Sequence, residues 1–305
     1  MDHKTFGKLV AALRRAQFNE DGERFTQAML ADKARELDPS TPLTDLLIGK
    51  IERGERAILD RAVLLSLIAA LDLTLGERQV FLQLASGLEN ADLYPIRGDA
   101  TAILETATRR VAELQLPALL LDQYLDVIAV NALVLPFYQV SILDLQKRAG
   151  EPAAFNLLSL IFSDGFAHMR EQMPRQQWHA FAVGNVIYFR RTTMPYRMTA
   201  YFQYLFERLW RSRDFRWFWE QVHYEDHLSF VGGEVFEMGD AVGGALRFLT
   251  APLVQLTPFG NLEIITHIPR NEATADYVHA LRQDRPSTVY PLASWPHKTI
   301  PAPVL

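Results

Sequence analysis

A group of polar side chains near the N-terminus has the types and spacing to contact nucleic acid. Lysine, threonine and aspartate side chains on an outward helix face can hydrogen-bond base edges in a DNA major groove, and glutamine and arginine side chains can bind phosphates. The expected base-contacting set is Thr44, Asp45 and Lys50. The expected phosphate-contacting set is Gln27, Arg53 and Arg56. The alternative is a helical scaffold whose charged face is only solvated.

A second group of side chains, between residues 155 and 219, is dense in aromatic rings. Pockets for apolar ligands are lined in this way, with a few polar groups that orient the ligand. We expect the pocket to use Leu158, Phe162, Trp178, Phe181, Phe189, Tyr201, Phe202 and Leu205. Arg190, Arg191 or Arg197 at its mouth would suit a carboxylate, and Asn131 would either bond the ligand or cap a helix. For each aromatic residue the alternative is ordinary packing in a helix–sheet core.

The residues closest to a metal motif are His223 and His227, because positions i and i+4 share a helix face. Tyr224 stands where the glutamate of the H-E-x-x-H pattern would be, and no third ligand shares that face easily. No G-x-S-x-G sequence occurs, and no Ser/His/Asp set stands out. We therefore expect no metal site, no catalytic residue and no cofactor.

Composition narrows the class of protein further. The 305 residues include no cysteine, which excludes disulfides and thiolate metal sites and fits a reducing cytosol. The net charge of −5 argues against a broadly basic nucleic-acid binder. DNA affinity would then depend on local placement of basic side chains and on a homodimer. No apolar run approaches the roughly 20 residues of a membrane span, so we expect a cytoplasmic protein.

The positioning elements follow from hydrophobic periodicity and turn signals. Helices are predicted at residues 5–17, 25–37, 43–54, 61–71, 75–85 and 101–116. Strands are predicted at residues 118–122, 126–130, 230–238, 245–257 and 262–268. Further helices are predicted at residues 155–162, 175–190, 195–211, 215–224 and 276–282.

This order predicts a multidomain chain, in which an all-α five-helix DNA-binding domain is followed by an α+β PAS-like sensor domain. The helical domain would span residues 1–88 and the sensor residues 118–285. Residues 89–117 would link the two, and residues 286–305 would form a Pro-rich, extended tail. Two strands, a helical insert and three meandering strands are the order expected of a PAS-like sensor.

The residues of the helical domain resemble those of a known family. Gln27, Leu30-Ala31 and the segment Ile48–Gly54, followed by Leu75–Ala85, resemble the helix-turn-helix of the XRE (phage-repressor-like) family. The resemblance covers about the first 87 residues. It implies that the chain is a transcription regulator that binds double-stranded DNA.

Residues from about 95 to 275 resemble the ligand-binding domain of MmyB-like (MltR-type) transcription regulators. The matching segments are Leu121–Asn131, Phe155–Phe162, Trp178, Leu209–Trp219 and Gly243–Leu246. The resemblance implies a PAS-like pocket for a small apolar ligand, such as a long-chain fatty acid or a similar lipid. Two alternatives stay open: an enzyme whose active site is the aromatic pocket, and a ligand-binding scaffold without DNA binding.

Overall fold

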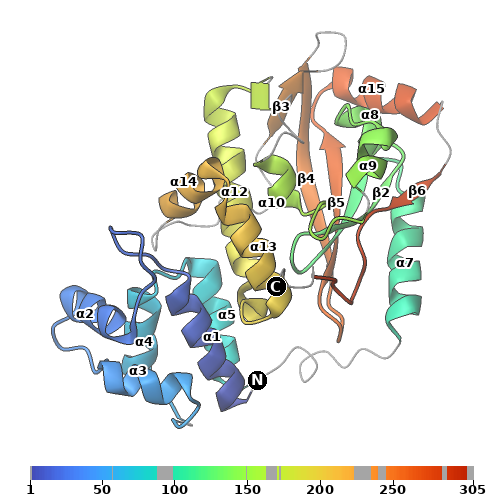
Figure 1. The fold of residues 1–305 in the computed structure, drawn as a ribbon. Helices are drawn as coiled ribbons and strands as arrows, with labels where there is room; N and C mark the ends of the chain where they lie inside the picture. The colour runs from blue at the N-terminus through green and yellow to red at the C-terminus, as the bar shows by residue number, and fades with distance from the viewer. Residues whose placement is uncertain are drawn as a thin grey trace.

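The structure, a computed structural model, describes residues 2–56, 58–87, 99–148, 150–162, 170–171, 173–222, 235–239, 245–283 and 287–300. Five N-terminal helices form one unit, and a six-stranded antiparallel sheet with flanking helices forms the other (Figure 1). The predicted fold class, all-α followed by α+β, is confirmed.

The helices of the N-terminal unit are α1 (His3–Arg15), α2 (Gln27–Leu37), α3 (Asp45–Glu52), α4 (Arg61–Ala70) and α5 (Leu75–Ala85). Each begins after an Asp or Thr side chain that accepts a hydrogen bond from a backbone N–H of the first turn. These caps are Asp2, Thr26, Thr44, Asp60 and Thr74. Gly54, with φ of +71°, follows α3, and a Cβ there would lie 2.8 Å from the Cα of Lys4. Glycine therefore permits both the turn and the close approach of α1.

One large side chain from each helix is fully buried in the core of this unit: Leu9, Leu30, Ile48, Leu67 and Phe81. Burying a side chain of this size contributes about 1.5–3 kcal/mol. The five helices are therefore held around a single apolar centre, as the sequence predicted.

The sheet has the strand order β3-β4-β5-β1-β2-β6, and every neighbouring pair is antiparallel. The strands are β1 (Ala118–Asp122), β2 (Val127–Asn131), β3 (Phe236–Gly239), β4 (Ala245–Gln255), β5 (Leu262–Pro269) and β6 (Val289–Pro291). Five of them were predicted in this order, and β3 is the described part of the strand expected from residue 230. The sixth, β6, lies in the predicted tail and pairs with β2.

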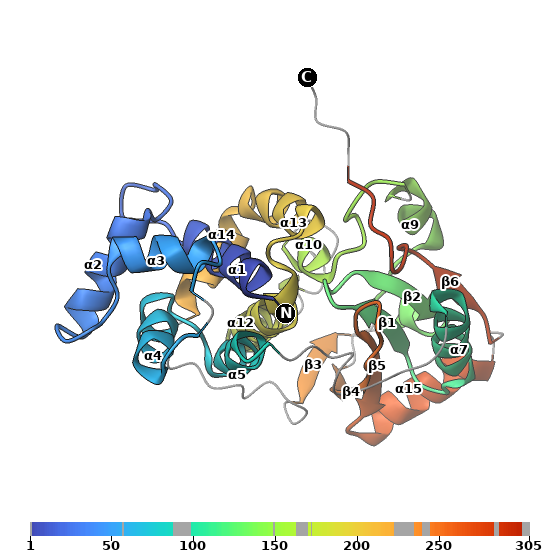
Figure 2. The same cartoon turned by 90° about the horizontal axis from the view of Figure 1, so that it is seen from below.

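The sheet is covered on both faces, so every residue of β1 and β2 is buried. Leu119 and Leu121 of β1 face a cluster built from helices, whereas Leu120 between them faces α7 (Ala100–Glu113). Figures 1 and 2 show α7 on one side of the sheet and α12 and α13 on the other. Residues 101–116 were predicted to connect the two domains. Instead α7 packs on the sheet, because Ile103, Ala107 and Val111 form one apolar stripe.

The remaining helices lie around the sheet: α8 (Val134–Phe137), α9 (Ile142–Arg148), α10 (Leu157–Ile161), α12 (Arg175–Thr192), η2 (Met194–Tyr196), α13 (Ala200–Trp210), α14 (Arg213–Gln221) and α15 (Glu272–Gln283). The sequence predicted one helix over residues 195–211. The chain forms η2 and α13 instead, because the Thr199 side chain caps a new helix start. The short helices α8 and α9 were not predicted.

The tail is extended but tied to the sheet. Beyond β6, Trp295 is buried against the α7 cluster, and the ammonium of Lys298 lies 2.7 Å from an oxygen of Asp126. Lys298 is also ion-paired with Asp122. These contacts fasten the tail to the β1–β2 turn.

Candidate ligand cavity and DNA-binding face

A cavity of about 920 Å³ lies between the sheet and α12. Alternate residues of three strands and their turns form one wall, because side chains two apart on a strand face the same side. This wall consists of Leu119, Leu121 and Gln123; Asn261, Glu263, Ile265 and His267; and Thr250, Pro252, Val254 and Leu256. The strand register pairs Leu121 with Glu263 and Glu263 with Val254, so the three rows are continuous. The volume falls in the range of about 300–1,000 Å³ typical of small-molecule sites.

The opposite wall comes from one face of α12 and from the N-terminal unit. Helix α12 contributes Phe181, Asn185, Tyr188, Arg191 and Thr192. Helices α1 and α5 contribute Thr5, Val80, Gln83 and Leu84. A molecule in this cavity would therefore lie where the two units meet.

His267, in the cavity wall, has both ring nitrogens engaged. Its Nδ1 lies 3.0 Å from the carbonyl oxygen of Pro117, and its Nε2 lies 2.5 Å from the hydroxyl of Tyr138. Since a carbonyl only accepts, Nδ1 carries the proton and Nε2 accepts from Tyr138. Burial lowers the pKa of His267 to about 4, so the ring is neutral at physiological pH.

Glu263 is the buried acid of the cavity. Its Oε2 accepts a hydrogen bond from the hydroxyl of Tyr188, and its Oε1 has no hydrogen-bond partner among the described residues. Burial raises the pKa of Glu263, while the Tyr188 hydrogen bond and the charge of Arg191 act in the opposite direction. The cavity wall therefore contains a buried carboxyl oxygen that no described residue satisfies.

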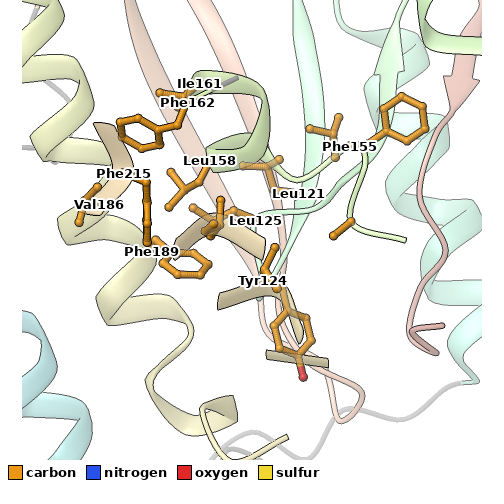
Figure 3. Packing of buried hydrophobic residues seen from close by; sticks show 14 of the residues in the cluster. Leu121, Tyr124, Leu125, Phe155, Leu158, Ile161, Phe162, Val186, Phe189 and Phe215 are labelled. Carbon is orange, nitrogen blue, oxygen red and sulfur yellow. The ribbon is translucent and has the colours of Figure 1, made fainter. Parts of the chain in front are cut away.

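Most residues that the sequence assigned to the ligand fill a core instead. Phe181 lines the cavity, and Trp178 packs beside it with ring centroids 5.8 Å apart. The others lie in the packed cluster between sheet and helices: Leu158, Phe162, Phe189, Tyr201, Phe202 and Leu205. Figure 3 shows Leu158, Phe162 and Phe189 packed with Phe215 around Leu125. The structure thus favours the packing alternative for these residues.

Two polar residues of the predicted site have structural partners. The hydroxyl of Tyr201 donates to Asp126 at 2.5 Å. Asn131 donates to the carbonyl of Leu116 at 2.8 Å and accepts from the backbone N–H of Ala118 at 3.1 Å. Asn131 therefore fixes the turn between α7 and β1, and its amide also lies 3.4 Å from the carbonyl oxygen of Leu114, the C-cap residue of α7.

Arg190 and Arg197 do not lie at the cavity mouth. Both guanidinium groups are buried and bind Glu77 of α5, with an Arg190 Nη2 to Glu77 Oε2 distance of 3.0 Å. Burial opposes ionisation of Glu77, but the two arginines outweigh it and lower the pKa of Glu77 to about 2. Both guanidinium groups also lie over the ring of Trp219. The arginines predicted to hold a carboxylate ligand thus bind a carboxylate of the N-terminal unit.

Apolar contacts extend this junction. Met194 of η2 is fully buried in the core of the N-terminal helices. Phe18 stacks on Trp210 of α13 with ring centroids 4.7 Å apart. The segment from Arg190 to Arg197 therefore joins the cavity helix α12 to the helical unit.

Comparison with known proteins agrees with this architecture. A family model described as the MmyB-like transcription regulator ligand binding domain matches residues 105–281, more than half of the chain. The chain belongs to this family. The match includes α12 and the cavity strands β1, β4 and β5, and it ends before β6. No curated protein matches the chain.

The family match does not reach α1–α5, so DNA binding by this regulator stays a prediction. Of the residues predicted to contact bases, Lys50 is exposed near the end of α3. Thr44 is the N-cap of α3 and accepts from the backbone N–H of Leu47, while Asp45 is exposed and accepts from that of Leu46. Leu46 itself is 64% exposed. This face of α3 thus combines an exposed lysine near the end of the helix with a capped, partly apolar helix start.

The residues predicted to bind phosphate have partners within the regulator. Gln27 donates to Glu52 at 2.6 Å, and Glu52 also receives both arms of Arg14. Arg53 forms an exposed ion pair with Glu55 at 2.6 Å. Arg56 is exposed and donates to the carbonyl of Ile58 at 3.2 Å. Arg53 and Arg56 are accessible to a phosphate, whereas Gln27 is used to fix α2 against α3.

His223 and His227 lie outside the described residues, as do Gly243 and Gly244. Within the described ranges, no group of three or more His, Asp or Glu side chains could hold a metal ion. No helix in the described part of the chain is long and apolar enough to cross a membrane.

Sequence reasoning missed the polar residues of the cavity wall. Asn261 lies directly before β5, and Glu263 and His267 lie on one face of β5, which was predicted only as an apolar strand. Polar residues at every second position of a strand between two covered faces indicate a lined cavity. Glu77 was also missed as the partner of the arginines, since it lies 113 residues from Arg190.

Proposed function

We propose that this protein is a one-component transcription regulator. It binds double-stranded DNA as a homodimer through α3. It senses a single-chain lipid, such as a long-chain fatty acid or a related lipid, in the cavity between α12 and the sheet. The observation that carries the proposal is the shared lining of that cavity. Thr5, Val80, Gln83 and Leu84 of the helical unit face the same space as the strands of the ligand-binding domain.

The cavity suits an acyl chain in its middle and polar groups at its ends. Along β1 and β5 the central wall is Leu119, Leu121 and Ile265, while Glu263 and His267 flank Ile265 on the same face of β5. An acyl chain leaves water with about 0.8 kcal/mol per buried CH₂ group. A dozen methylenes would give roughly 10 kcal/mol before association costs of several kcal/mol. Micromolar or tighter binding is therefore expected.

The proposed mechanism is a population shift. The ligand would bind the arrangement of the two units seen in this structure more tightly than any other arrangement, and so would stabilise it. This would fix the distance between the two copies of α3 in the dimer. The salt bridges of Glu77 with Arg190 and Arg197 would hold α5 to the α12 end in that arrangement. Effector and DNA would then influence each other reciprocally.

The enzyme alternative gains no support from the cavity wall. Its histidine, His267, is bonded at both nitrogens and neutral, so it has no free position for acid–base chemistry. Glu263 is bonded to Tyr188 and has no activated nucleophile as partner in the described lining.

Two experiments test the proposal. Native mass spectrometry with lipid extraction of the purified full chain should find a retained single-chain lipid. Footprinting on the upstream region of its own gene should show a specific site that Lys50→Ala weakens by about 1–3 kcal/mol. Arg56→Ala should weaken binding to all sequences, and Glu36→Ala, an exposed change on α2, is the control. No lipid and no footprint under any condition would contradict the proposal.

A further inference from the structure

Three side-chain oxygens at one end of the cavity are buried without a hydrogen-bond partner among the described residues. They are Oε1 of Gln123, Oδ1 of Asn261 and Oε1 of Glu263. Gln123 and Glu263 are 6% and 5% exposed. Buried polar atoms are nearly always hydrogen-bonded, so three such atoms together indicate a bound group.

The strand register brings the three side chains to one place. Leu121 is opposite Glu263 and Asp122 is opposite Leu262, and Gln123 and Asn261 are the residues directly beyond this last pair. All three belong to the cavity wall, on the same face of the sheet. Gly260 helps to make room, since a Cβ there would lie 2.3 Å from Oε1 of Gln123.

The chemistry of these atoms selects the group that would satisfy them. Carboxylate and amide oxygens accept hydrogen bonds, so the ligand must present O–H or N–H donors. The amides of Gln123 and Asn261 can turn over and present nitrogen instead. A hydroxyl group fits both orientations, because it donates and accepts.

A carboxylate headgroup fits this end less well. It carries no donor and would place a second negative charge beside Glu263. Arg191, the arginine in the cavity lining, balances only one of the two. Asp122, also in the lining, is ion-paired with Lys298, whose ammonium is therefore occupied. Tyr188 donates to Glu263, and His267, bonded to Tyr138, brings no positive charge.

We propose that the ligand is a single-chain lipid with an uncharged, hydroxyl-bearing headgroup, which Gln123, Asn261 and Glu263 hold by hydrogen bonds. The inference rests on the proposed function, in which the apolar middle of the cavity holds the acyl chain. It adds the class of headgroup, and it distinguishes a glycerol-type ester from a free fatty acid.

The test compares three probes with one acyl chain on the lipid-free, full-length protein: monomyristoylglycerol, methyl myristate and myristic acid. Calorimetry should give a Kd for the glycerol ester at least about tenfold lower than for the other two, since it alone forms several new hydrogen bonds. Glu263→Leu and, separately, Asn261→Ala should remove this preference and leave the methyl ester unaffected. Ile265→Ala, on the same strand face, should weaken all three probes by one common factor.

Each other result has a distinct meaning. Equal affinities for the glycerol and methyl esters would show that water satisfies the three oxygens, and the headgroup inference would be wrong while lipid sensing stood. Tighter binding of myristic acid would also overturn it and would assign the headgroup to Arg191. If none of the three probes binds, the proposed lipid sensing fails, and the headgroup inference fails with it. The comparison of probes on the unaltered protein needs no variant, so it holds even if Glu263→Leu does not fold.

Discussion

The sheet face that meets α12 is packed over one half and hollow over the other. Over β2 it is filled by aromatic and aliphatic side chains, and Leu158, Phe189 and Phe215 there are fully buried, while Leu119 and Leu121 of β1 border both this cluster and the cavity. Over β4 and β5 the same face carries Thr250, Glu263 and His267 around a cavity. The difference teaches that dense aromatic sequence indicates packing, whereas polar residues alternating along a buried strand indicate a site for a ligand.

The junction of the two units belongs with the packed regions. Glu77 of α5 is fully buried between Arg190 and Arg197, and Met194 completes the core of the helical unit. Helix α12 thus presents one surface to packed contacts and another to the cavity. Variants on the packed surfaces should change stability, and variants on the hollow surface should change ligand binding.

The largest loss of stability is expected for Glu77→Ala. It leaves two buried guanidinium groups without their carboxylate, and breaking a buried ion pair in this way costs about 3–5 kcal/mol. Urea unfolding should show the loss. Glu36→Ala, at an exposed position of α2, is the control and should be neutral. A stability equal to that of the wild type would mean that the junction is not packed as described.

Leu158→Ala in the aromatic core should be nearly as destabilising. Truncation of a fully buried leucine costs about 2–5 kcal/mol, through lost burial and a new void. Leu143→Ala, which is 63% exposed on α9, is the matched control. If Leu158→Ala were to alter chain-length preference for lipids while leaving the melting temperature unchanged, the core and the cavity would have been assigned the wrong way round.

Because His267 is neutral in the folded protein, we expect the free energy of unfolding to depend on pH, with an effect of intermediate size. Its pKa is depressed in the folded state to about 4, below the ordinary value of 6.5, so the unfolded state takes up the proton first. The stability that it contributes is complete above about pH 6.5 and is lost as the pH falls toward 4. The total is of the order of 3 kcal/mol. Unfolding free energies of the wild type and His267→Gln should therefore converge across this window, and a constant difference would contradict the account.

Ile265→Trp should have the smallest effect on stability and a clear effect on ligand. The indole would enter hollow space, so the strain of about 1–3 kcal/mol that follows insertion into a full core should be largely absent. Capacity for the longest acyl chains should be lost first, as read by calorimetry over a chain-length series. Leu253→Trp, at a position 57% exposed on β4, is the control. If Ile265→Trp strongly destabilised the protein without loss of lipid binding, the sheet face over β4 and β5 would be packed and would not line a ligand cavity.

The secondary structure could be predicted well because its signals are local. The apolar stripes of the helices and the turn signals between them predicted bounds within a few residues of those observed, and in the structure Thr44, Asp60 and Thr74 cap three of these helices. Strand β6 was missed because Val289–Pro291 is too short to show alternation. The family resemblance stated for residues 95–275 agrees with the family match over residues 105–281.

The cavity was harder to predict than the fold. Its wall combines strands β1, β4 and β5 with α12 and α5, and no local pattern indicates which faces meet. Arg190 and Arg197 were assigned to a ligand because the sequence offers no sign that Glu77 is their partner. Long-range pairing of charges depends on tertiary structure, which the spacing of residues in one segment does not encode.

The central claim is that occupancy of the cavity controls DNA binding through the junction at Glu77. The most direct test measures DNA affinity of the full chain, lipid-free and then saturated with monomyristoylglycerol or myristic acid, by fluorescence anisotropy on its footprinted site. DNA affinity should change by about 5–150-fold between the two states, the usual range of allosteric coupling, and Glu77→Gln should abolish this change. Identical DNA affinities for the two states, with saturation verified by calorimetry, would contradict it.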